Sequence, residues 1–286
     1  MKPKHYSLDV RGLSIHWVEW GQRGRQQPVI LVHGFRDHCR TWDFFVAELL
    51  AAQPDLWVVA PDCRGHGDSG WVGAGGYYHF FDYLLDIDFL VRHLAAPIVQ
   101  LVGHSMGGTI ACLYAGTCPE RVSKLALVEG LGPPGMSFPD APRRAVRWLT
   151  EIPDVGEGAG YANLGEAADR LRRSYPRLTE ERARHLAYHG MRRTETGAWQ
   201  WKFDPLHRTT SPQPFYLEQF REFLRRVACP TVVIQGAESE HRARGDIQAR
   251  HGWLPGAELV TLPGAGHMVQ QDNPEALARI LASFLA

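Results

Sequence analysis

The chain has 286 residues, of which 44% are hydrophobic and 22% are charged. This composition provides enough apolar material for a full core and excludes a disordered chain. Lysine plus arginine and aspartate plus glutamate number 31 each, and the resulting zero net charge argues against nucleic acid as a partner.

The sequence contains no run typical of a membrane segment or an export signal. Every apolar run falls short of the roughly 18 residues that a bilayer-spanning helix needs. The first six residues hold no apolar signal core, so we expect a cytoplasmic protein without a membrane partner. The five cysteines include no C-x-x-C pair, which predicts neither a disulfide framework nor a zinc site.

Short apolar runs alternate with helical patterns along the first half of the chain. Several runs are continuous and β-branched, which is typical of strands buried on both faces of a parallel sheet. The alternation predicts an α/β protein with a doubly wound, mostly parallel sheet. In chain order, we expect strands at 14–19, 29–32, 57–60, 98–102 and 125–128, and helices at 41–52, 77–94 and 106–117.

The pattern breaks after residue 130. Residues 131–226 contain no strand-like run and hold two Arg/Glu-rich helical stretches, at 141–150 and 179–189. Strands resume at 231–235 and 258–262, and the chain ends in a helix at 274–285, with Asn273 as its cap and Pro274 in its first turn. We therefore expect a core made of residues 1–130 and 227–286, interrupted by a helical lid at 131–226.

The motif Gly103-His104-Ser105-Met106-Gly107-Gly108 follows one of the predicted strands and precedes a helix. This is a G-x-S-x-G pattern in a strand–turn–helix context. Its flanking glycines permit a sharp turn that exposes the serine oxygen, and the following helix directs its N–H groups toward that point. The pattern predicts that Ser105 is a catalytic nucleophile.

Two further motifs provide the other parts of an acyl-transfer site. His33-Gly34-Phe35 ends the second buried strand, and its loop can supply one oxyanion donor, the main-chain N–H of Phe35, while Met106 supplies the other. His33 itself is expected to brace this loop. His267 lies on a Gly-rich turn after the last strand, at the sheet edge where such sites assemble, and is predicted to be the general base.

Together these motifs resemble those of the α/β-hydrolase superfamily over nearly the whole chain. His33-Gly34-Phe35, residues 62–69, residues 103–108 and Gly266-His267 occur in the family's order. The resemblance implies an α/β-hydrolase sheet with a helical lid inserted after the sixth strand, and serine chemistry without a cofactor. Residues 128–134 resemble the serine hydrolase-like branch. Residues 62–69 are expected to brace the edge of the site.

The acid that completes a catalytic triad is not identified by these motifs. In most of the family it is an aspartate in the loop after the strand that follows the lid, and the matching residue here is Ser239. Three glutamates stay candidates. Glu129 ends the strand at 125–128, where some branches carry the acid, and Glu240 and Glu238 flank the usual position. Glu129 leads because a carboxylate beside a Gly/Pro-rich loop has few structural roles.

A serine nucleophile excludes relatives that form an alkyl ester on an aspartate. We expect Ser105 to cleave a carboxylic ester or related acyl bond of a small molecule through an acyl-enzyme, without a metal. Carbon–carbon bond hydrolysis, perhydrolysis, and amide or lactone cleavage use similar residues and stay open, as does a small-molecule sensor with little turnover. Trp199, Trp201 and Phe203 are candidate substrate-binding residues, and Phe215, Tyr216 and Phe220 could also line an apolar acyl pocket. The alternative is that these rings pack the lid onto the sheet.

Overall fold

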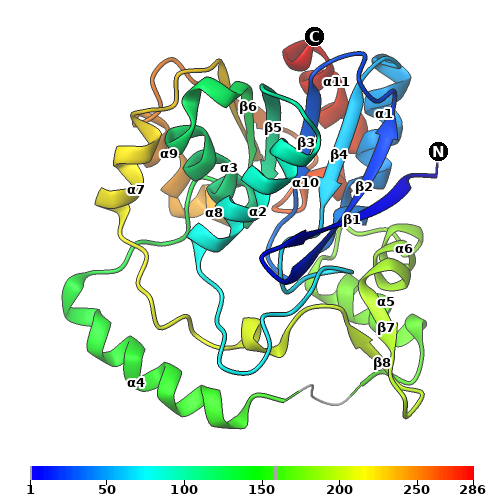
Figure 1. The fold of residues 1–286 in the computed structure, drawn as a ribbon, viewed down its shortest axis with the longest axis vertical. Helices are drawn as coiled ribbons and strands as arrows, with labels where there is room; N and C mark the ends of the chain where they lie inside the picture. The colour runs from blue at the N-terminus through cyan, green and yellow to red at the C-terminus, as the bar shows by residue number, and fades with distance from the viewer. Residues whose placement is uncertain (1, 157–159) are drawn as a thin grey trace.

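The residues that the structure describes, 2–156 and 160–286 of a computed structural model, build an eight-stranded sheet (Figure 1). Residue 1 of the predicted core and residues 157–159 of the predicted lid lie outside the described residues. The strand order is β1-β2-β4-β3-β5-β6-β9-β10. β2 pairs antiparallel with β1 and β4, and all other neighbours pair parallel. The strands are β1 (Lys4–Val10), β2 (Leu13–Gly21), β3 (Pro28–Val32), β4 (Trp57–Pro61), β5 (Val99–His104), β6 (Val122–Val128), β9 (Thr231–Gly236) and β10 (Glu258–Leu262).

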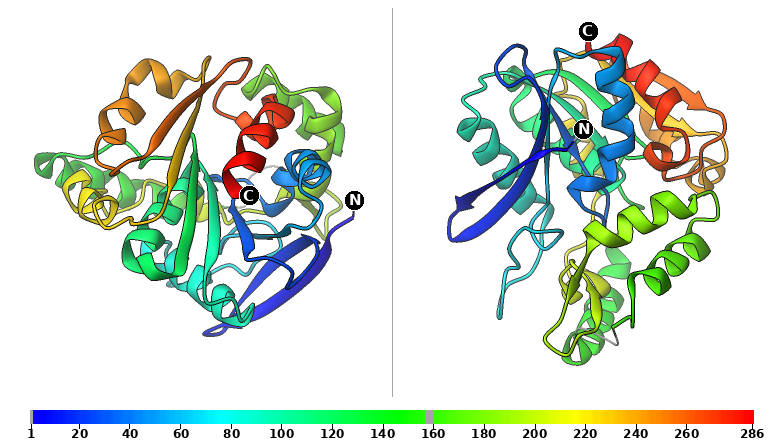
Figure 2. Two further views of the ribbon diagram at one scale, coloured as in Figure 1. Left: turned by 90° about the horizontal axis from the view of Figure 1, so that it is seen from above. Right: turned by 90° about the vertical axis from the view of Figure 1, so that its right-hand side faces the viewer.

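Two apolar layers fix helices to the two faces of the sheet (Figure 2). Successive side chains of a strand point to opposite faces. In β3, Val29 and Leu31 therefore join one layer, and Ile30 and Val32 join the other. The first layer holds α1 (Asp43–Ala52), α10 (Val269–Asp272) and α11 (Pro274–Leu285), and the second holds α2 (Phe80–His93), α3 (Met106–Thr117), α7 (Leu217–Leu224) and α9 (Asp246–His251). No helix in the described parts of the chain is both long enough and apolar enough to span a bilayer.

The predicted strands are all present, and the structure adds β1. Its sequence places polar residues along an edge strand that is mostly exposed, so it lacks the apolar run that marks the buried strands. The last helix begins as predicted, because the Asn273 side chain accepts the N–H of Ala276 at 3.2 Å. α2 begins at Phe80 and not at residue 77, because His79 has extended backbone angles and its N–H donates to Asp82. Tyr77 and Tyr78 therefore lie in a loop.

The segment between β6 and β9 is mainly helical, with one difference from the prediction. A short antiparallel pair, β7 (Met191–Arg193) and β8 (Trp199–Trp201), interrupts the helices, and three residues are too few to show a strand pattern in sequence. α5 (Leu164–Ser174) and α6 (Glu180–Gly190) share a small apolar cluster of their own. α4 (Ala141–Glu151) has no buried residue and lies away from the sheet (Figure 1).

The last helix of this segment packs on the sheet. Phe220 and Leu224 of α7 belong to the main apolar layer with α3. The division into a core and a lid at 131–226 stays a prediction, and the packing of α7 shows that the end of the segment contributes to the central core.

Candidate active site

Ser105 lies on a sharp turn between β5 and α3. Its backbone angles are φ 51° and ψ −115°, a strained combination for a residue with a side chain. The turn requires glycine at position 107, because a Cβ atom there would lie 2.1 Å from the carbonyl oxygen of Val32. The strain exposes the serine hydroxyl at the carboxyl edge of the sheet, as the G-x-S-x-G motif predicts.

His267 connects Ser105 to a carboxylate. It follows β10, and its Nε2 atom lies 3.1 Å from Ser105 Oγ. Its Nδ1 atom lies 3.2 Å from Oε2 of Glu129. With the ring hydrogen on Nδ1, this nitrogen donates to the carboxylate and Nε2 accepts the hydrogen of the serine hydroxyl. The structure thus brings together three residues that are far apart in the sequence.

Glu129 is held in place by main-chain and side-chain donors. It directly follows β6 with a positive φ of 54°, and its side chain is fully buried. Oε1 accepts the N–H of Gly236 at 2.7 Å, and Oε2 accepts the hydroxyl of Ser239 at 2.6 Å. Buried carboxylates need such donors, and here they also fix the oxygen that faces His267.

The other two candidate acids lie elsewhere. Glu238 accepts the N–H of Gly264 at 3.2 Å on the surface, and Glu240 is the first residue of α8 (Glu240–Arg244). Neither is among the described residues that line the cavity beside Ser105. Of the three glutamates, Glu129 is the one for which the structure gives a hydrogen bond to His267.

The loop after β3 lies against the serine turn. A Cβ atom on Gly34 would be 3.4 Å from that of Ser105. In the described chain, the main-chain N–H groups of Phe35 and Met106 donate to no protein acceptor, and both residues line the cavity. His33 braces this loop as predicted, because its Nδ1 donates to the carbonyl of Gly34 and its Nε2 accepts the N–H of Cys63.

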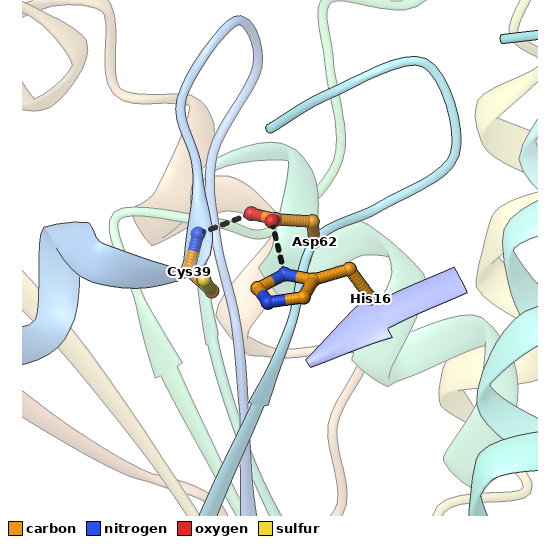
Figure 3. A group of neighbouring side chains, drawn as sticks. All are labelled: His16, Cys39 and Asp62. Atoms are coloured by element: carbon orange, nitrogen blue, oxygen red, sulfur yellow. Dashed lines mark hydrogen bonds and ion pairs between the residues drawn. The ribbon is translucent and has the colours of Figure 1, made fainter. Parts of the chain in front are cut away.

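A buried carboxylate joins this loop to the segment 62–69 (Figure 3). Asp62 Oδ2 accepts His16 Nδ1 at 2.7 Å, and Oδ1 accepts the N–H of Cys39 at 2.7 Å. A third bond, from the N–H of Asp68 at 2.9 Å, closes the segment on itself. These bonds agree with the bracing role predicted for residues 62–69.

Two groups of side chains in the described residues could hold a metal ion by proximity, namely His16, Cys39 and Asp62, and Asp43, His185 and His189. In the first, the hydrogen bonds above already use the carboxylate and the His16 nitrogen. Burial and the neighbouring Asp62 raise the pKa of the Cys39 thiol well above its ordinary value, so it stays protonated and is a poor ligand. In the second, the guanidinium of Arg40 already binds Asp43.

His104 is a contributor that the motif analysis left without a role. Its Nε2 donates to the carbonyl oxygen of His267 at 2.8 Å, and its Nδ1 accepts from Gln270. Burial and the nearby His267 lower its pKa well below the ordinary value, which agrees with a neutral ring. His104 therefore fixes the backbone of the residue that faces Ser105. The sequence signal that could have identified His104 is its position in the G-x-S-x-G motif, directly before Ser105.

A cavity of about 630 Å³ lies beside Ser105 and His267. Its lining includes Phe35, Met106 and Glu129 from the sheet edge. Most of its wall is apolar, and a large part of the wall comes from α2, α7 and the segments that precede them. The phenylalanine and tyrosine residues of this wall are Tyr77, Tyr78, Phe80, Phe81, Tyr83, Phe215, Tyr216, Phe220 and Phe223.

Trp199, Trp201 and Phe203 are not among the described residues of this lining, which corrects that part of the expectation, whereas Phe215, Tyr216 and Phe220 belong to it. Trp199 and Trp201 on β8 pack against the cluster of α5 and α6. The Phe203 ring lies near the guanidinium groups of Arg36 and Arg208, at 5.7 and 5.5 Å. These rings stabilise the inserted segment, and residue type alone could not separate that role from ligand contact.

The sheet order, the strained serine after β5 and the histidine after the last strand define a hydrolase-type α/β enzyme. The family model described as the alpha/beta hydrolase family matches residues 29–280, and the chain belongs to this family.

Individual proteins that are similar to this chain are hydrolases by name. A Drosophila melanogaster protein, a serine hydrolase by name, is 37% identical over 131 residues, which are 46% of this chain and 38% of that protein. An esterase of Mycobacterium tuberculosis is 25% identical over 96% of this chain and 88% of its own. Among solved structures, a thioesterase domain from the curacin biosynthetic pathway matches with a TM-score of 0.89 and 28% identity, over 99% of this chain and 100% of that one.

Proposed function

We propose that the protein hydrolyses carboxylic esters or thioesters through an acyl-enzyme on Ser105. The observation that carries this proposal is the pair of contacts at His267, 3.1 Å to Ser105 Oγ and 3.2 Å to Glu129. An imidazole between a hydroxyl and a buried carboxylate is the arrangement that activates serine for acyl transfer.

In the first half of the reaction, Ser105 Oγ attacks the carbonyl carbon while His267 Nε2 takes the hydroxyl proton. Negative charge moves to the carbonyl oxygen, and the N–H groups of Phe35 and Met106 stabilise it. Glu129 keeps the ring hydrogen on Nδ1 and stabilises the positive imidazolium. His267 then returns the proton to the leaving alcohol or thiol, which departs as the carbon–oxygen or carbon–sulfur bond breaks.

In the second half, water replaces the alcohol. His267 takes a proton from the water as the water oxygen attacks the acyl carbon, and the same two N–H groups hold the oxyanion. The proton passes to Ser105 Oγ as its bond to carbon breaks, which releases the acid and restores the enzyme. The reaction consumes one water and needs no other reactant.

The cavity and the relatives support an acyl substrate. The aromatic wall suits an apolar acyl chain beside Ser105. Two of the similar proteins are an esterase and a thioesterase domain by name. The segment at 131–226 is proposed to act as the lid of this cavity, since Arg144, Thr209 and Gln213 from it belong to the lining.

The test combines active-site labelling with turnover. A fluorophosphonate probe should label the native protein but not the Ser105→Ala variant. p-Nitrophenyl esters of increasing acyl length should give a burst of nitrophenol that the variant lacks, with Ser123→Ala, remote from the cavity, as the matched control. Absence of both labelling and turnover in the folded native protein would contradict the proposal, and tight ligand binding without labelling would identify a sensor.

A further inference from the structure

One side of the cavity beside Ser105 is polar, in contrast to its aromatic wall. The polar side comes from the inserted segment, from one face of α4 and from residues 209–213. Figures 1 and 2 place α4 apart from α3, whose first turn carries the proposed oxyanion donor. The residues of this side are Arg144, Arg147, Thr209, Thr210, Ser211 and Gln213.

Most charges in the cavity lining are already compensated. Arg147 Nε donates to Glu151 Oε1 at 2.6 Å, and the N–H of Thr210 donates to the other oxygen of that carboxylate. These contacts, Arg147 first, lower the pKa of Glu151 to about 2. At the sheet edge, Glu129 faces His267, and Asp246 forms an ion pair with Arg250 at 3.4 Å.

Arg144 differs from these groups. It is half-buried, and its Nε donates to the carbonyl oxygen of Ser211 at 2.5 Å. In the described chain it has no carboxylate within ion-pair distance. A partly desolvated guanidinium without a counter-charge favours an anion from outside the protein, and its remaining amino groups can donate to two oxygens. Its neighbour Arg143 is exposed and forms an ion pair with Asp140, so the charge of Arg143 is already compensated.

We propose that Arg144 binds a carboxylate on the acyl chain of the substrate. The preferred substrates are then half-esters or half-thioesters of dicarboxylic acids, in which an apolar chain along the aromatic wall separates the reacting carbonyl from the charged end. This inference rests on the proposed function, because it names the class of acyl group that Ser105 would receive.

The test compares charged and neutral esters of equal shape. The charged substrates are p-nitrophenyl hydrogen adipate, suberate and sebacate, and each neutral partner carries a methyl ester in place of the free carboxylate. For the native protein we expect a kcat/KM at least about tenfold higher with the charged ester of best length, as one charge-assisted contact provides. This preference should weaken as salt is added.

Variants assign the preference to one side chain. Arg144→Gln should raise KM for the charged ester about tenfold, with kcat and the neutral ester changed less than about twofold. Arg143→Gln is the matched control and should keep the native preference. Arg144→Lys should keep part of it, because the charge remains without the two-pronged geometry. Equal losses on both esters, or a native protein without any preference, would overturn the inference.

A binding measurement separates this inference from the proposed function. Suberate should raise the melting temperature more than octanoate does, and Arg144→Gln should remove the difference. If esters are hydrolysed without a charge preference and suberate has no advantage, Arg144 has no such role while the hydrolase function stands. If no ester is turned over but suberate binds through Arg144, the subsite stands and the proposed reaction fails.

Discussion

Ser239 donates its hydroxyl hydrogen to Oε2 of Glu129 across 2.6 Å. These residues follow neighbouring parallel strands, since Val128 of β6 pairs with Ile234 of β9. Ser239 occupies the position where the family resemblance places an aspartate, and Glu129 reaches the same region from the next strand. Oε2 of Glu129 lies 3.2 Å from Nδ1 of His267, and the serine hydroxyl is one of the donors to this oxygen.

The acid can be tested by removing its charge. Glu129→Gln keeps the shape but loses the carboxylate that holds the His267 tautomer, so we expect kcat to fall by about 10³- to 10⁴-fold on a p-nitrophenyl ester. Glu240→Gln should stay within about twofold of the native protein. Steady-state kinetics of both variants at one pH provide the comparison, and the reverse ranking would transfer the role to Glu240.

Moving the carboxylate back to the β9 loop should rescue that loss. In the double variant Glu129→Gln, Ser239→Asp, the new carboxylate replaces a hydroxyl that lies 2.6 Å from Oε2 of Glu129, and we expect it to face Nδ1 of His267. We expect it to recover about tenfold or more of the activity lost in Glu129→Gln. Ser239→Asp alone should lose stability, because two buried carboxylates repel. Kinetics and urea unfolding of the three variants measure both effects, and no recovery would mean that Nδ1 is out of reach.

Two variants of the proposed oxyanion loop test whether its main chain or its side chains matter for catalysis. In Gly34→Ala the new methyl group would lie 2.8 Å from His104 Nδ1, so the loop must shift. We expect kcat to fall by about 10- to 100-fold. Phe35→Leu keeps the N–H and changes a half-exposed ring, so kcat should change less than about threefold. The kcat values of the two variants on a short-chain ester, such as p-nitrophenyl acetate, test this, and a larger effect of Phe35→Leu would speak against a main-chain role.

His207 should make stability depend on pH. The centre of its ring lies 4.2 Å from the centre of the His66 ring and 4.1 Å from the centre of the Tyr78 ring. Burial, and then Arg36, lower its pKa to about 3. Between the unfolded value of about 6.5 and pH 3, the unfolded chain binds a proton that the folded protein does not, so stability falls as the pH falls.

The comparison with His207→Phe isolates this contribution. The variant keeps an aromatic ring in the stack but cannot be protonated. Between pH 7.5 and pH 5 the native protein should lose about 2 kcal/mol more unfolding free energy than the variant does. Urea unfolding at the two pH values measures this difference, and identical losses would show that His207 does not titrate on unfolding.

Local sequence patterns were enough to predict the strands and helices whose apolar residues recur regularly. The buried strands and the first and last helices lie close to their predicted positions because continuous apolar runs and a capping asparagine act over a few residues. β1, β7 and β8 were missed, since an exposed edge strand and three-residue strands carry little apolar signal. α2 begins three residues later than predicted, because the N–H of His79 donates to Asp82 and caps the helix there.

The sequence by itself determined the turn that exposes Ser105, the loop that carries His267 and the order of the two along the chain, because glycine spacing and strand–helix succession are local properties. The tertiary structure alone decided which of the three candidate glutamates meets His267 and which of the six candidate aromatic residues line the cavity. Both depend on which strand ends and helices become neighbours, and residues such as Glu129 and Ser239, 110 positions apart, meet only when the packed sheet brings them together.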